Sequence, residues 1–267
     1  MKKLLLLVPI LILVYNSFSQ EKVYPITQTN KRFVKIDEKL YVDKFEVTVH
    51  DYITFLDEVK KNGRDISILM YDSTSWRHII NNKSMVEDYY FNKSIYFFYP
   101  IIGISNFAAQ EFCKWLTEKY NADPNRKFNK VVFRLPTEQE FIKVAISIYD
   151  TTKSLYPWGY QSLYNRKIKK NCNFLEIDQT KIDLTEKGWH IQELNIHPMP
   201  ESVNSYKPNP YGIYNIVGNV SEMIQEDHYA MGGDYLSSGY NVRINSKKYF
   251  REPISTIGFR VYMEILD

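Results

Sequence analysis

The chain has 267 residues, of which 44% are hydrophobic and 15% aromatic, enough to build one well-packed core. Its 34 basic and 31 acidic residues nearly balance to a net charge of +3, which gives no argument for a nucleic-acid-binding surface. The 22 tyrosines and 15 phenylalanines favour a fold rich in strands and loops, where large amphipathic rings pack well.

The first 19 residues have the pattern of a secretory signal peptide. Two lysines precede an apolar run from Leu4 to Val14, and small residues follow at Ser17 and Ser19. The run is shorter than the roughly 20 residues of a membrane span, and cleavage is expected after Ser19. We therefore predict an exported protein, periplasmic or extracellular, with one domain over residues 20–267 and no transmembrane span.

Three helices are predicted from capping residues that precede apolar stripes. Thr48 is the expected N-cap of the first helix. Ser105 is the N-cap of the second, directly after a short buried strand at Ile101–Ile104. Thr137 begins the third, and Glu140 stands three residues later, so the two form a capping box.

The stretches 61–99 and 150–210 lack a regular period, yet sequence landmarks run through and around them in a fixed order. They are VDKFEVTVHDYITFL, YPIIGISNFAAQEFCKWL, FRLPTEQEF, YPWG, NCN, NPYGIYNIVGNVSEM, MGGDYL and GFRVY. On these landmarks, residues 36–263 resemble the formylglycine-generating enzyme family, also called the sulfatase-modifying-factor domain. The resemblance implies a single α+β domain related to C-type lectins, with much irregular chain.

Two further stretches resemble one branch of that family in particular. YDSTSW at 71–76 and the later YYFNKSIYFFYPIIGIS are similar to the gliding-motility and type IX secretion proteins of the Bacteroidetes. This narrower resemblance implies a role at the cell envelope. Those relatives are usually larger and lipid-anchored, whereas no cysteine lies near the expected cleavage point of this chain.

The resemblance places the copper-binding positions of the active enzymes at Ser237 and Val242. In those enzymes two cysteines bind copper(I), and oxygen then converts a substrate cysteine to formylglycine. Copper(I) prefers soft thiolates, so a hydroxyl is a poor ligand for it and a valine is none. The two cysteines of this chain lie elsewhere. We therefore expect no copper and no catalytic residue at these positions.

Other chemistries have weaker sequence support. The five histidines show no i, i+4 spacing of the kind that holds zinc or iron. A serine nucleophile near residue 237 would lack the G-x-S-x-G elbow. A divergent oxidase or another metal-dependent enzyme remains an alternative, and a calcium-dependent glycan binder is a third, which rests on fold analogy alone.

One metal site of the family is retained in the loop NIVGNVSE. By position, Asn215 and Glu222 would offer calcium their side-chain oxygens, and Gly218 and Val220 their carbonyls. Calcium takes about six to eight oxygen ligands of this mixed kind. The alternative is a structural turn in which Glu222 caps the chain or forms an ion pair.

A second calcium site of the family falls at Asn171 and Cys172, with Asp178 and Asp183 as candidate acidic partners. The same cysteine raises another question. Cys113 and Cys172 could pair in an oxidising compartment, or both could remain buried thiols. The sequence leaves the two states open, because it does not tell how far apart the Cα atoms lie.

The remaining landmarks contain two kinds of residue. Some are expected to stabilise the fold, and others are expected to line the former substrate cleft. Arg134 and Arg260 are expected in buried ion pairs, with Glu138 or Glu140 as candidate partners. The cleft is expected to be lined by four residues, which are Tyr235, Ser237, Tyr240 and Trp158. Exposed tyrosines give a large contact area at low entropic cost. We therefore expect a binding or assembly role, in which the cleft holds a peptide, a glycan or an envelope protein.

Overall fold

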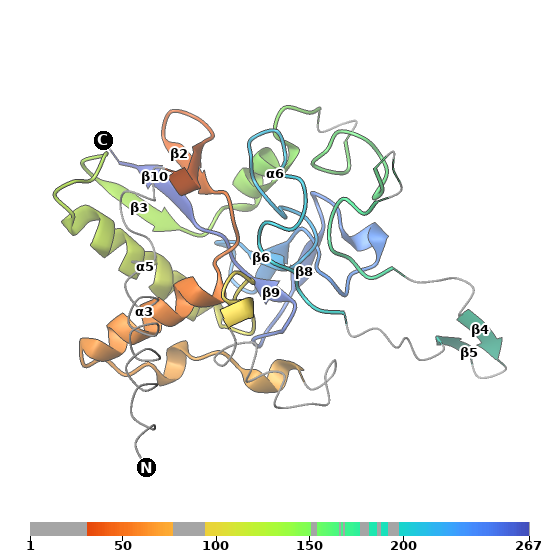
Figure 1. The fold of residues 1–267 in the computed structure, drawn as a ribbon, viewed down its shortest axis with the longest axis horizontal. Helices are drawn as coiled ribbons and strands as arrows, with labels where there is room; N and C mark the ends of the chain where they lie inside the picture. The colour runs from red at the N-terminus through yellow and green to blue at the C-terminus, as the bar shows by residue number, and fades with distance from the viewer. Residues whose placement is uncertain are drawn as a thin grey trace, which may run out of the picture.

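A computed structural model describes most of the chain beyond its N-terminal segment (Figure 1). The described residues are 31–76, 94–150, 154–165, 167, 169–176, 182–185, 188–191 and 198–266. The predicted signal peptide, Asp178 and the first five residues of the second branch motif (89–93) lie outside them. Within them, no helix is both long and apolar enough to cross a bilayer.

The three predicted helices are present, and each begins at its predicted cap. They are α3 (Val49–Lys61), α5 (Asn106–Ala122) and α6 (Glu138–Ile146). Thr48 and Thr137 both form complete capping boxes, and the Ser105 hydroxyl accepts from the backbone N–H of Ala108. Short 3-10 helices lie between them and later, at Ser67–Leu69 (η1), Ser73–Trp76 (η2), Ser94–Tyr96 (η4) and Gly239–Asn241 (η6).

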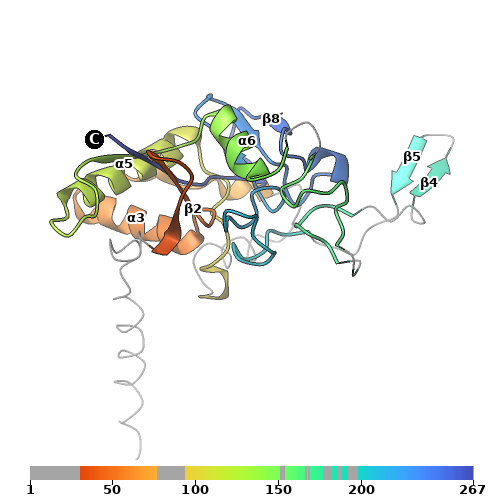
Figure 2. The ribbon, with the colours of Figure 1, turned by 90° about the horizontal axis from the view of Figure 1, so that it is seen from above.

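The first sheet joins the two ends of the described chain. Its strands are β1 (Phe33–Lys35), β2 (Leu40–Asp43), β10 (Tyr262–Ile265) and β3 (Val131–Arg134), in that order and all antiparallel. Helices α3 and α5 lie side by side in both views (Figures 1 and 2), and α5 packs against β3. The Asn121 side chain bonds to both the N–H and the carbonyl of Val131, so α5 covers this edge strand.

The second sheet has the order β8, β7, β6 and β9, whose bounds are Lys247–Tyr249, Tyr229–Met231, Ser221–Met223 and Ile257–Gly258. Strands β6 and β9 run parallel and the other pairs antiparallel. These short strands all lie in the last fifth of the chain. A separate hairpin of β4 (Ile182–Thr185) and β5 (Gly188–Ile191) was not expected, and it lies to one side of the main sheets (Figure 1).

The strand predicted at Ile101–Ile104 is wrong, although its burial is right. Ile101, Ile102 and Ile104 are all nearly inaccessible, yet the segment is irregular and turns at Gly103, whose φ is 68°. Within the described part of the chain, the strand-like pairing of this region is a single bridge between Thr48 and Pro100. The N–H groups of the segment bond instead to loop carbonyls, from Ile101 to Val47 and from Gly103 to Ile254. A buried apolar run predicts burial, but a ladder requires a partner strand that sequence does not reveal.

Two hydrophobic clusters form the core. One lies among α3, α5 and β3, and the predicted stripes of the two helices belong to it. The other gathers around α6 and the C-terminal loops, and includes Val242, Ile216 and Met231. The loops that carry the family landmarks therefore rest on the second cluster, which fixes their backbone.

Candidate functional site

A buried ion pair lies where the two sheets meet the NIVGNVSE loop. Arg260 and Glu222 are both 0% exposed, and Arg260 Nη2 donates to Glu222 Oε1 at 2.6 Å. The guanidinium also donates to the backbone carbonyls of Asp43 and Tyr214, at 3.1 and 2.7 Å. The predicted burial of Arg260 in an ion pair is confirmed, but its partner is Glu222 and not Glu138 or Glu140.

The second predicted arginine has a different environment. Arg134 donates two parallel hydrogen bonds to Glu140, both at 2.7 Å, and a third to Glu264 at 2.8 Å. Its side chain is 20% exposed, so the pair is only partly buried. Glu138 pairs with Lys247 instead. Glu140 is therefore confirmed as a partner of Arg134 and Glu138 is not.

A second buried carboxyl group, which was not predicted from the sequence, lies beside the pair of Arg260 and Glu222. Glu46 is 0% exposed and accepts hydrogen bonds from Asn215 Nδ2 at 3.1 Å and Asn219 Nδ2 at 2.9 Å. Burial raises the pKa of Glu46 to about 8, an effect that the positive charge of Arg260 lessens and the negative charge of Glu222 increases. The only hint of this burial in the sequence was that the charged Glu46 stands between the apolar residues Phe45 and Val47.

The NIVGNVSE loop has an unusual backbone. Asn215, Gly218 and Asn219 have φ values of 50°, 74° and 63°, in the left-handed region that glycine and asparagine tolerate best. A Cβ on Gly218 would lie 2.6 Å from the carbonyl oxygen of Asn173, and the Asn219 N–H bonds to that same carbonyl. The loop therefore packs directly on the NCN turn, so the two predicted calcium segments are neighbours.

The two copper positions of the family hold structural residues. Val242 is 0% exposed and belongs to the second hydrophobic cluster. Ser237 is half-buried, and its hydroxyl accepts from the Asp234 N–H at 3.1 Å within a tight turn. A Cβ on Gly233 would lie 2.3 Å from the carbonyl oxygen of Asn241, so the double glycine allows the backbones of this loop to touch. One position thus packs a core and the other closes a turn.

Aromatic side chains cluster beside that loop. Trp158 stacks on Tyr156 at 5.1 Å between ring centroids, and Tyr160 lies 6.2 Å from Trp158. Tyr240 is 70% exposed, and the Arg243 guanidinium lies 3.9 Å from its ring centroid. We call the half-buried Trp158 and the exposed Tyr160 and Tyr240, with Arg243, the aromatic face.

One hydrogen bond links the two chain segments that carry the aromatic face. The Tyr156 hydroxyl donates to the carbonyl of Gly239 at 3.2 Å, across 83 residues of sequence. Tyr235 does not belong to this face, contrary to the prediction, because it is 0% exposed and its hydroxyl donates to the Ser255 carbonyl. Of the four residues predicted to line the cleft, Trp158, Ser237 and Tyr240 are at least partly exposed.

A comparison with protein families matches residues 16–265 to the sulfatase-modifying factor enzyme 1-like domain. The chain belongs to this family. A Bos taurus protein named inactive C-alpha-formylglycine-generating enzyme 2 is 28% identical over 137 residues, which are 51% of this chain. The match spans only 36% of the bovine protein's length.

Three solved structures share the fold of this sulfatase-modifying-factor protein. PvdO from Pseudomonas aeruginosa has a TM-score of 0.52 at 14% identity, over 84% of this chain and 80% of PvdO. CarF has a TM-score of 0.54 at 18% identity, over 85% of this chain and 87% of CarF. Treponema denticola variable protein 1 has a TM-score of 0.50 at 17% identity, over 84% of each chain. The predicted α+β fold is confirmed.

The first calcium loop of the family fits a cation in part. Asn215 Oδ1 is buried without a hydrogen-bond partner among the described residues, as an oxygen meant for a metal would be. Two buried carboxyl groups, Glu46 and Glu222, face the guanidinium of Arg260, and burial raises the pKa of Glu46 to about 8, so a bound cation would favour loss of its proton. Glu222 itself, however, accepts from Arg260 with both of its oxygens.

The residues predicted for the second calcium site have other contacts in the structure. Asn171 Nδ2 donates to the Tyr160 hydroxyl at 2.8 Å, and Cys172 is buried in the second hydrophobic cluster. Asp183 lies in β4 opposite His190, whereas Asp178 falls outside the described residues. In the described part of the chain, no three His, Cys, Asp or Glu side chains gather as a metal site.

Both cysteines are free thiols buried in different clusters. Cys113 packs between α5 and the first sheet, and Cys172 packs beneath the NIVGNVSE loop. Burial raises the pKa of each thiol to about 12. The structure thus resolves the open question in favour of two unpaired thiols, and neither forms the thiolate that copper or an oxidant would require.

Breaking the buried ion pair should strongly destabilise the fold. Replacing Arg260→Met leaves Glu222 buried and uncompensated, so the free energy of unfolding should fall by about 3–5 kcal/mol. Glu222→Leu should have a similar effect, and the double variant should recover part of the loss. Urea denaturation followed by circular dichroism measures each value.

The control for this experiment is an exposed pair of the same protein. Lys143 and Asp37 are about half exposed, so Lys143→Met should cost about 1 kcal/mol or less. If Arg260→Met cost no more than this control, the buried pair would not be a structural requirement.

Proposed function

We propose that this protein is a non-catalytic member of the sulfatase-modifying-factor family that acts by binding at the cell envelope. In this proposal residues 1–19 direct export, and residues 20–267 form the binding domain in the periplasm or outside the cell. The bovine relative that carries the word inactive in its name supports a member without catalysis.

One observation carries the proposal. Val242 is a fully buried core residue and Ser237 closes a turn through its hydroxyl, so the two copper positions serve the fold. Neither side chain offers the soft sulfur that copper(I) requires. The remaining thiols are buried in other clusters and stay protonated, so they do not substitute for the missing pair.

The aromatic face is the proposed binding surface. Tyr240 is 70% exposed and stacked with Arg243, and large rings beside a guanidinium are the residue types that concentrate binding energy at interfaces. Trp158 is held by Tyr156 and by a hydrogen bond from its Nε1 to the Ser162 carbonyl, so it is preorganised. A peptide, a glycan or an envelope protein would bind here without chemical conversion.

Calcium is the proposed structural cofactor of the NIVGNVSE loop. The ligands would be Asn215 Oδ1 and the carbonyls of Gly218 and Val220, with the charge of Glu46 nearby and Glu222 held by Arg260. When bound, the ion would supply positive charge that keeps Glu46 ionised at neutral pH. The site at Asn171 and Cys172 stays a weaker proposal.

A role in gliding motility or type IX secretion is the narrowest part of the proposal. It rests on the resemblance of 71–76 and the following aromatic stretch to that branch of the family. A partner in the envelope would then be a subunit of such an assembly. This role is tested by capturing envelope proteins on the purified chain and identifying them by mass spectrometry.

The unaltered chain should not oxidise cysteine. Incubated with copper, oxygen and a peptide that carries a sulfatase-type cysteine, it should yield no aldehyde, because it lacks both thiolate ligands. Mass spectrometry after hydrazide capture detects the aldehyde. An active enzyme of the family, run in parallel, shows that the conditions support turnover, and formylglycine from the unaltered chain would overturn the proposal.

Calcium should stabilise the protein and magnesium should do so less. With calcium at about 100 times its Kd, linkage predicts a gain of about 2.7 kcal/mol and a rise in Tm of several degrees over the EDTA-treated protein. Glu46→Gln should reduce the rise in Tm, since it removes the carboxyl group that a bound ion would keep ionised. Glu38→Gln, on a carboxylate that is 93% exposed, is the matched control. If the Tm were the same with calcium and with EDTA, the proposed calcium site would be contradicted.

Removing the aromatic face should abolish capture of the envelope partner. The double variant Trp158→Ala, Tyr240→Ala should capture at most about one tenth of the envelope protein or glycan that the unaltered chain captures, as expected when hot-spot residues are lost. Phe98→Ala is the control, because Phe98 is 67% exposed and lies outside the face. Quantitative mass spectrometry of the captured proteins and glycans gives the ratio, and equal capture by all three chains would contradict this assignment.

A further inference from the structure

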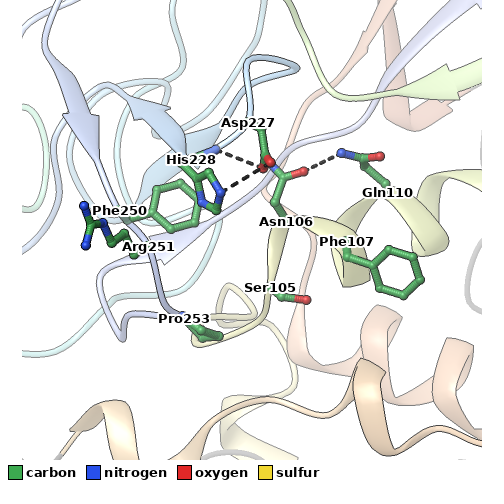
Figure 3. A pocket seen from close by; sticks show the side chains of 9 residues that line it. All are labelled: Ser105, Asn106, Phe107, Gln110, Asp227, His228, Phe250, Arg251 and Pro253. Carbon is green, nitrogen blue, oxygen red and sulfur yellow. Dashed lines mark hydrogen bonds and ion pairs between the residues drawn. The ribbon is translucent and has the colours of Figure 1, made fainter.

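A pocket of about 370 Å³ lies where the N-terminus of α5 meets the turn between β6 and β7 and the segment after β8 (Figure 3). Its walls come from three distant parts of the chain, represented by Asn106, His228 and Phe250. None of its lining residues belongs to the aromatic face or to the NIVGNVSE loop. The pocket is therefore separate from both proposed sites.

Asn106 presents an unsatisfied donor at this pocket. The residue is 6% exposed, and its Nδ2 has no hydrogen-bond partner among the residues that the structure describes. Its Oδ1 accepts from Gln110 Nε2, which fixes the orientation of the amide (Figure 3). A buried donor without a partner is unfavourable, so the position calls for an acceptor from a ligand.

His228 presents the complementary group. Its Nε2 lies 3.4 Å from Asp227 Oδ2, and its backbone N–H donates to Asp227 Oδ1 at 3.0 Å (Figure 3). A neutral ring with its proton on Nε2, facing that carboxylate, has an acceptor lone pair on Nδ1. Nδ1 is also buried without a partner in the described chain. The pocket thus offers one unused donor and one unused acceptor.

The charges and rings around the pocket narrow the ligand class. Asp227 disfavours an anion and Arg251 disfavours a cation, so a neutral ligand suits both charges. A hydroxyl group can accept from an amide and donate to an imidazole at once. The Phe107 ring is 51% exposed and Phe250 lies across the pocket, so apolar surface adjoins the polar groups.

We propose that this pocket binds a neutral saccharide. The hydroxyls of one sugar residue would pair with Asn106 Nδ2 and His228 Nδ1, while Asp227 and Arg251 take further hydroxyls at the rim. The apolar C–H face of the sugar would lie against Phe107. No metal is involved, and the site stands independently of the aromatic face.

The test is binding of neutral sugars to the full chain in EDTA, measured by saturation-transfer NMR and calorimetry. The probes are glucose, galactose, mannose, N-acetylglucosamine and cellobiose. At least one should bind, and Asn106→Ala and Asp227→Asn should each weaken its affinity at least about tenfold, because the first removes the buried donor and the second replaces a charged acceptor with a weaker neutral one. Asp227 is 65% exposed, so its variant tests the site even if Asn106→Ala fails to fold.

Two control variants separate this site from other surfaces. Glu252→Gln makes the same charge change as Asp227→Asn at an exposed residue that does not line the pocket, and it should bind sugar normally. Trp158→Ala, on the aromatic face, should also bind normally, so failure here and failure of the proposed function are distinguishable. The inference is overturned if no sugar binds, if both pocket variants bind unchanged, or if acetate or an acidic peptide binds more tightly than the sugars.

Discussion

The buried contact between Arg260 and Glu222 holds this structure together. Placing two charges in the interior is unfavourable unless each finds hydrogen-bond partners, and here the guanidinium meets a carboxylate and two backbone carbonyls. Those partners come from the end of β2, from the NIVGNVSE loop region and from β6. One side chain thus fixes the first sheet, the second sheet and the irregular loop relative to one another.

That constraint does not depend on the two positions that the family resemblance assigns to copper. The architecture depends on the ion pair, the capped helices and the glycine-permitted contacts of the loops, none of which requires a metal-binding thiolate. Val242 and Ser237 have been absorbed into the packing and turn geometry of the same scaffold. The two surfaces proposed for recognition, the aromatic face and the pocket at the start of α5, lie on different elements.

Contacts between residues that are close together in the chain could be predicted from the sequence. Thr137 and Glu140 are three residues apart, so their capping box was predictable. The sequence was least informative for contacts across the fold, such as the choice of Glu222 as the partner of Arg260. Tyr235 was expected in the cleft from its place in the MGGDYL landmark, whereas tertiary packing buries its ring completely.

By itself, the sequence indicated the family, determined the three helix starts and placed Ser237 and Val242 where the resemblance expects copper ligands, because these depend on residue identity and short spacing. Only the tertiary structure decided which charges are paired, which rings are exposed and where a pocket opens. Glu46 and Asn219 meet across 173 residues, and the pocket is lined from three separate segments. Such proximity arises from the packing of the whole core, which no local pattern of residues specifies.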